Sequence, residues 1–243
     1  AGLISFMKGL VDSGPTKAGH RTPAIIATLP ANGRTASEVR ANPWQIRQLL
    51  SSGVHGILLT HARQADAVRA FVEECRYPFH KSGRQGLGEG QRGAGGQVKP
   101  AEIWGIDAQE YVNIADPWPL NPEGELFLGV KLENQESAAN AEAICSVPGL
   151  AFAEWGPSDM GMSFGFTNAN GPPYIEEMNL VRERIKAACD DNNLNFLCSW
   201  NDPSMTEEQK IRKLMDLGTH IFAGGEEMAN IGRKITQRKM PVG

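Results

Sequence analysis

The sequence lacks the features that would direct it to a membrane, to nucleic acid or to a secretory route. No run of about 18 apolar residues occurs in its 243 residues, so no transmembrane helix is expected. The formal net charge of −4 and the pI near 5.8 argue against nucleic acid as the main partner. The first residues lack the architecture of a signal peptide. We therefore expect a cytoplasmic globular protein with a sizeable core.

Cysteine is also scarce, and its placement excludes the common cysteine-based sites. The four cysteines form no CxxC pair and no cluster with histidine, so neither a structural zinc site nor a redox pair is predicted. The chain contains no GxxxxGK[ST] phosphate-binding loop. We expect reduced thiols in the core at Cys75, Cys145, Cys189 and Cys198.

What the chain does contain is an alternation of short apolar runs with stretches of helical periodicity. Most of the apolar runs are nearly continuous, which is typical of strands that are buried on both faces. Such alternation predicts parallel βα units with right-handed crossovers. The predicted strands span about 23–29, 55–61, 126–133, 150–156, 193–200 and 219–225. The predicted helices span about 3–12, 43–52, 63–76, 135–146, 173–190, 204–217 and 226–237.

Two details of this pattern need separate mention. The helix at 204–217 opens with Ser204 as its expected N-cap and Glu207 three residues later, which is the spacing of a capping box. The segment 79–125 breaks the alternation, because seven of the fourteen residues at 83–96 are glycine and a proline-rich stretch follows. A short helix is expected at 103–115. We expect this long insertion to be a functional lid, a contact to another subunit or disordered.

Two acidic residues stand where predicted strands end. Glu133 closes the run at 126–133, and Asp159 follows the run at 150–156. Because the carboxyl ends of parallel strands meet at one rim, these side chains are expected to lie near each other. Hard divalent cations take oxygen ligands, so the pair suggests a metal site. Glu133 could instead be a helix N-terminal charge, and Asp159 could instead form a turn or a cap.

Several blocks resemble, in order, motifs of the HpcH/HpaI aldolase family, which includes 4-hydroxy-2-oxo-heptanedioate aldolase. The carboxylate blocks are the most specific: residues 130–133 resemble "V-Q-I-E", and residues 156–160 resemble "G-P-x-D-L". The similarity covers most of the chain from about Pro23 onward. Further matches are the strand at 53–62, the helix stop at 76–78, the turn at 90–93 and the unit at 217–225.

This resemblance implies a class II aldolase on a (β/α)8 TIM barrel, acting on a 2-oxo acid, usually pyruvate, with an aldehyde as partner. Glu133 and Asp159 would hold a divalent metal, Mg²⁺ or Mn²⁺, with Co²⁺ or Zn²⁺ as alternatives. Gly156, Pro157, Ser158 and Asp159 would bind the substrate, with backbone N–H groups of the last two meeting its carboxylate. The family commonly forms hexamers, so a homo-oligomer is expected.

The resemblance also bears on how complete the barrel is. The chain is expected to form a single α/β barrel domain over residues 1–243, with the insertion at about 79–125. A closed barrel needs eight strands, and the predicted strands fall two short. If the first predicted strand corresponds to the third strand of the family, two strands and the acid/base histidine would lie before residue 1.

The sequence departs from the family pattern at two positions. Thr28 stands where the family has an arginine, and Lys131 stands where it has a glutamine. Residues i and i+2 of a strand share a face, so Lys131 should point the same way as Glu133. We expect Lys131 to stabilise charge that develops on the substrate, or to pair with Glu133 or another carboxylate, or to form a Schiff base. His61 is a candidate general base, and Arg92 a candidate anchor of the insertion at the site.

Two other functions fit the same residues. A metal-dependent enzyme could start from oxaloacetate and release CO₂. Alternatively, the barrel could have lost activity and serve as a subunit or binding module.

Overall fold

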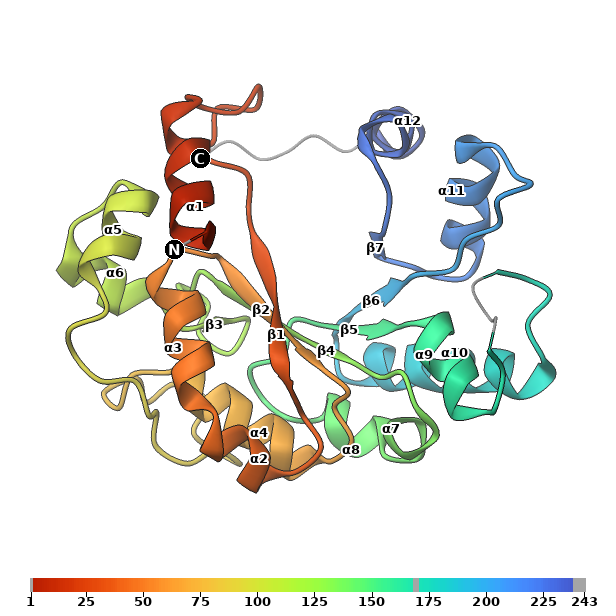
Figure 1. Ribbon diagram of the computed structural model, residues 1–243, viewed down its shortest axis with the longest axis horizontal. Coiled ribbons are helices and arrows are strands. Elements are labelled where there is room, and N and C mark those ends of the chain that lie inside the picture. Colours follow the sequence, from red (N-terminus) through yellow and green to blue (C-terminus); the bar gives the residue numbers. More distant parts are fainter. Residues whose placement is uncertain (1, 168–170, 238–243) are drawn as a thin grey trace.

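The computed structural model describes residues 2–167 and 171–237, and it contains one parallel sheet with helices packed against it (Figure 1). The strands are β1 (Ile26–Asn32), β2 (Gly56–Thr60), β3 (Pro117–Trp118), β4 (Leu126–Lys131), β5 (Phe152–Trp155), β6 (Asn195–Cys198) and β7 (Ile221–Phe222). The helices are α1 (Gly2–Asp12), α2 (Ala36–Ala41), α3 (Pro43–Ser51), α4 (Ala65–Cys75), α5 (Val98–Trp104), α6 (Ala108–Ile114), α7 (Gln135–Ala139), α8 (Ala141–Cys145), α9 (Pro157–Ser163), α10 (Glu176–Asp191), α11 (Glu207–Asp216) and α12 (Glu226–Thr236).

The order of strands follows the order of the chain. The sheet runs β1-β2-β4-β5-β6-β7, and the short β3 pairs beside the start of β4. A doubly wound sheet reverses its order at a switch point, whereas a βα barrel adds each strand next to the previous one. The observed order is therefore of the barrel kind, and the prediction of a parallel α/β fold is confirmed. None of the described helices is long and apolar enough to cross a bilayer.

The two faces of the sheet carry different apolar layers. The larger cluster packs the sheet against its helices, for example through the fully buried Ile57, Leu128 and Phe196. The opposite face carries a small cluster built on Leu58 and Phe152, with partly buried side chains around it. In a βα barrel this second face lines the interior. Because successive residues of a strand point to opposite faces, every second residue contributes to each layer.

The segment 79–125 is more regular than its composition suggests. It contains α5, α6 and β3, and Gly105 separates the first helix from the second with a φ of 78°, a left-handed conformation that suits glycine. The expected single helix at 103–115 is therefore two helices. A buried ion pair ties the end of this segment to α4, because Arg76 Nε lies 2.7 Å from Asp116 Oδ1. A role as lid or subunit contact stays a prediction.

Two local expectations are wrong in detail. The N-cap of α11 is Thr206, whose partner in the capping box is Gln209, and not the predicted pair Ser204 and Glu207. The expected helix at 135–146 is divided at Asn140 into α7 and α8. The structure also contains the short helix α9 after β5, with Pro157 at a first-turn position that proline tolerates.

Candidate active site

Three side chains that can bind a cation converge at the carboxyl-terminal edge of the sheet. His61 follows β2, Glu133 follows β4, and Asp159 lies in the first turn of α9 after β5. Among the described residues, one ligand atom from each of the three lies within 4.8 Å of the other two. Two carboxylates suit Mg²⁺ or Mn²⁺, and an added imidazole favours Mn²⁺, Co²⁺ or Zn²⁺. The expected nearness of the two carboxylates is met by the geometry.

Glu133 is the buried centre of this group. It is 1% exposed, and its two carboxylate oxygens contact different partners. Oε1 lies 3.3 Å from His61 Nδ1, and Oε2 lies 3.2 Å from Lys131 Nζ. Burial raises the pKa of Glu133, and Asp159 raises it further, against the opposing effects of Lys131 and His61. A divalent cation bound at this carboxylate would offset the cost of burying its charge.

Lys131 lies between two glutamates on neighbouring strands. Its Nζ is 3.2 Å from Glu133 and 3.7 Å from Glu154 Oε1, and the side chain is 23% exposed. Burial alone would lower the pKa of Lys131, but the carboxylates of Glu154 and Glu133 outweigh it and raise that pKa. A protonated amine is a fixed positive charge and a poor nucleophile. The geometry therefore favours an electrostatic role for Lys131 over a Schiff base.

The turn that precedes Asp159 is shaped to fit Glu133. A Cβ on Gly156 would lie 3.0 Å from Glu133 Oε2, so a larger residue would crowd the carboxylate. Gly156 is the N-cap of α9, and Pro157 fixes φ in its first turn. Asp159 is thereby held on a short helical turn against the end of β4. The Gly-Pro-Ser-Asp block thus brings the carboxylate of Asp159 close to that of Glu133.

His61 adopts a backbone conformation that is unusual for a residue with a side chain. Its φ is 48°, in the left-handed region, although histidine is one of the residues more often found there. Such conformations cost free energy and concentrate at functional sites. The conformation is held by hydrogen bonds on its carboxyl-terminal side, from Ala62 N to Lys131 O and from Arg63 N to Gly33 O. The side chain of His61 is 36% exposed, so it faces both Glu133 and solvent.

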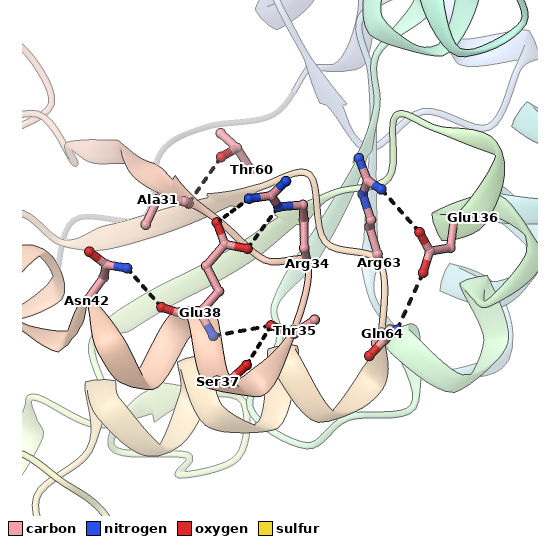
Figure 2. A network of polar contacts seen from close by, with 10 residues as sticks. All are labelled: Ala31, Arg34, Thr35, Ser37, Glu38, Asn42, Thr60, Arg63, Gln64 and Glu136. Atoms are coloured by element: carbon pink, nitrogen blue, oxygen red, sulfur yellow. Dashed lines mark hydrogen bonds and ion pairs between the residues drawn. The ribbon is translucent and has the colours of Figure 1, made fainter.

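The cationic side chains near the ends of β1 and β2 are already paired. Figure 2 shows Arg63 beside Glu136, at 3.2 Å, and Arg34 beside Glu38, at 2.9 Å. Both pairs are largely exposed, so they contribute little to stability. Thr28 lies on β1 in register with Leu58 and is exposed. The strand β1, Ile26–Asn32, contains no charged residue. Lys131 is therefore the cation that contacts the carboxylates.

Arg92 lies apart from this group. It is 5% exposed, with its guanidinium 4.2 Å from the centre of the Tyr77 ring and a hydrogen bond to Tyr111 Oη at 3.1 Å. It also donates to Ala115 O, just before β3, which begins beside the first residue of β4. Lys131 is the last residue of that strand, so Arg92 belongs to the opposite edge of the sheet. There it anchors the glycine-rich segment, as expected, but not near the carboxylates.

Sequence reasoning missed Glu154. This residue is directly opposite Lys131 in the parallel register of β4 and β5, is 7% exposed, and accepts a hydrogen bond from Ser199 Oγ at 2.7 Å. One signal was available, because a glutamate within a strand otherwise made of apolar residues is costly to bury without a partner. Its partner could not be read from the sequence, because the register between strands is set by the fold.

Comparison with known proteins shows which family model and which characterised enzymes the sequence resembles. Residues 16–232 match the family model described as HpcH/HpaI aldolase/citrate lyase. The chain is 28% identical over 195 residues to the hydroxypyruvate/pyruvate aldolase of Cupriavidus necator, which covers 78% of this chain and 62% of that protein. It is 25% identical over 194 residues to the 4-hydroxy-2-oxo-heptane-1,7-dioate aldolase of Salmonella typhimurium, covering 79% and 64%. The chain thus spans less than two thirds of the length of these relatives.

Solved structures support the fold. A HpcH/HpaI aldolase/citrate lyase family protein from Burkholderia cenocepacia superposes with a TM-score of 0.62 at 17% identity, covering 96% of this chain and 88% of that one. The HpcH/HpaI aldolase from Desulfitobacterium hafniense gives a TM-score of 0.59 at 15% identity, covering 98% and 89%. At these identities the likeness concerns the arrangement of strands and helices.

Proposed function

Because the chain belongs to the HpcH/HpaI aldolase/citrate lyase family, we propose that it forms or cleaves a carbon–carbon bond beside the ketone of a 2-oxo acid. The observation that carries this proposal is the convergence of His61, Glu133 and Asp159 within 4.8 Å at the edge where barrel sites form. The names of the relatives, hydroxypyruvate/pyruvate aldolase among them, make pyruvate or a close analogue the first substrate to test.

Glu133 and Asp159 would hold a divalent cation, with His61 as a third ligand or as a general base. When bound, such a cation polarises the ketone of the 2-oxo acid and orients its carboxylate. The buried Glu133 fits this role, because one of its carboxylate oxygens lies within 4.8 Å of a ligand atom of His61 and of Asp159. Mg²⁺ and Mn²⁺ suit the carboxylates, while Co²⁺ and Zn²⁺ become better candidates if the imidazole binds.

Lys131 would stabilise the negative charge that develops on the substrate oxygen. The two glutamates keep its amine protonated, and its distance of 3.2 Å from Glu133 places that charge beside the metal ligands. Gly156, Pro157, Ser158 and Asp159 would form the turn against which the substrate carboxylate lies. The interaction of Lys131 with the developing charge and that of the turn with the substrate carboxylate are both stronger where water is excluded.

Exchange of the methyl protons of pyruvate in deuterated water tests the proposal. With Mn²⁺ or Mg²⁺ present, we expect exchange to be visible by proton NMR and to be lost in Glu133→Gln. The matched control is Glu136→Gln, which removes an exposed carboxylate that is paired with Arg63 outside the site. Protein that binds metal but exchanges no protons would indicate a binding module instead. Release of CO₂ from oxaloacetate would identify the decarboxylase alternative.

A further inference from the structure

The candidate site contains more negative charge than its one lysine can balance. Lys131 Nζ contacts Glu133 and Glu154, and Asp159 lies beside Glu133, so three carboxylates gather near a single ammonium group. Glu133 and Glu154 are nearly buried, with side chains that are 1% and 9% exposed. Leaving buried carboxylates unbalanced is costly. Two negative charges in excess match the charge of one divalent cation.

The same geometry creates a conflict at Glu133. Lys131 Nζ lies 3.2 Å from Glu133 Oε2, so the ammonium group occupies one of the oxygens that a metal would use. Two cations held close to one carboxylate repel each other strongly where water is scarce. Lys131 therefore competes with the metal for Glu133, unless another group draws its amine aside.

Glu154 is placed to be that group. Its Oε1 lies 3.7 Å from Lys131 Nζ, and the two residues are direct neighbours across β4 and β5. Ser199 Oγ donates to the same oxygen at 2.7 Å, which fixes the carboxylate in position. A modest rotation of the long lysine side chain would exchange one glutamate for the other without moving either strand.

We propose that Glu154, held by Ser199, is a positioning residue that draws Lys131 away from Glu133 and so sets the affinity of the site for divalent cations. The inference rests on the proposed function and deepens it, because it assigns Glu154 a role through Lys131, the residue that stands where the family pattern has a glutamine. Lys131 keeps a carboxylate partner whether the metal is bound or absent. Its charge is then retained within the site instead of being expelled.

Binding of Mn²⁺ to the whole chain, measured from the electron paramagnetic resonance signal of the free ion, tests this inference without using activity. Glu154→Gln should weaken binding about threefold to tenfold, because Glu133 is then the one of its two contacting carboxylates that Lys131 keeps. Lys131→Met should strengthen binding, because the competitor is gone. Ser199→Ala should weaken binding in the same direction as Glu154→Gln but less. Glu136→Gln should leave binding within about twofold.

The double variant Glu154→Gln/Lys131→Met decides between two causes. If Glu154 acts through Lys131, the effect of Glu154→Gln disappears in the Lys131→Met background. If Glu154 only adds negative charge near the metal, Glu154→Gln weakens binding equally in both backgrounds, and the inference is overturned. Unchanged binding in Glu154→Gln also overturns it, while the proposed function stands. Wild-type protein that binds no Mn²⁺ overturns both. Circular dichroism establishes that each variant is folded.

Discussion

At the residue scale, the site keeps a cation but carries it on a different strand from the family pattern. Thr28 on β1 is exposed and uncharged, whereas Lys131 on β4 contacts two glutamates. An ammonium group is a compact point charge and cannot reproduce the two-pronged hydrogen bonds of a guanidinium. In the proposed role, Lys131 would therefore supply charge to a substrate oxygen without imposing a fixed hydrogen-bonding geometry.

Replacing Lys131 tests its proposed role in turnover. With the metal saturating, Lys131→Met should lower kcat by about 10²–10³-fold, the usual effect of losing one group that stabilises developing charge. Thr28→Val is the matched control and should change kcat by less than about threefold, because Thr28 is exposed and lies on β1. Steady-state kinetics at saturating Mn²⁺ measure both. Full turnover in Lys131→Met would dismiss the proposed role.

A second residue-scale prediction concerns stability and pH. Burial lowers the pKa of His55, whose Nδ1 accepts a hydrogen bond from Ile25 N at 3.1 Å. The unfolded chain takes up a proton near pH 6.5, while the folded chain resists it. The free energy of unfolding should therefore fall as the pH decreases from about 7 toward the folded-state pKa. His55→Asn keeps an acceptor for the N–H of Ile25 and does not titrate. Its free energy of unfolding should therefore fall less than that of wild type over the same decrease in pH.

Urea unfolding at pH 7.5 and pH 5.5 measures this difference. Other titrating groups are shared by both proteins, so the comparison isolates His55. An equal loss of stability in wild type and His55→Asn would contradict the assigned cause.

Three residues of the candidate site could be predicted from the sequence, and one could not. Glu133 and Asp159 were found because each follows an apolar run, and Lys131 because residues two apart on a strand share a face. Glu154 was missed because its pairing with Lys131 depends on the register between β4 and β5. Arg92 was expected near the site, but the path of a glycine-rich connection is not encoded in local periodicity.

At the scale of elements, two overlapping capping boxes compete in the sequence before α11. Ser204 and Thr206 each have a glutamate or glutamine three residues later, and the structure uses Thr206 with Gln209. Ser204 Oγ instead bonds to Asp202 Oδ1 at 2.7 Å, which leaves it in the preceding turn. Spacing alone could not separate them, because both satisfy the same pattern.

Alanine substitutions separate the two caps. Thr206→Ala should lower the free energy of unfolding by about 1 kcal/mol, because the backbone N–H of Gln209 loses its acceptor. Ser204→Ala, the matched control, should cost less than half as much, because its exposed hydrogen bond to Asp202 caps no helix. Chemical denaturation measures both. The reverse order would restore the cap that the sequence alone suggested.

Elements with strong apolar runs were predicted well, and short elements were not. The strands β2 and β4 lie within their predicted ranges because buried parallel strands read as continuous apolar sequence. The two-residue β3 and the seven-residue α9 carry too little periodicity to be recognised. In α9, Gly156 and Pro157 suit the start of a helix as well as they suit a turn.

At the scale of the whole molecule, the site joins βα units that are separate along the chain. His61, Glu133 and Asp159 follow β2, β4 and β5, which are successive neighbours in the main strand order. A cation that binds all three would couple these units, and a ligand that binds the folded chain alone stabilises it by mass action. The structure therefore links metal binding to the stability of the sheet as a whole.

Thermal unfolding with and without metal tests this link. At free Mn²⁺ of 100 times Kd, wild type should gain about 2.7 kcal/mol of stability. For a domain of this size, each kcal/mol raises Tm by about 2–4 °C. The gain should vanish on chelation, be lost in Glu133→Gln and persist in Glu136→Gln, since Glu136 pairs with Arg63 outside the site. An equal gain in Glu133→Gln would show that the cation binds elsewhere. A metal held by the carboxylate of Glu133, which is 1% exposed, should bind less tightly once that charge is removed.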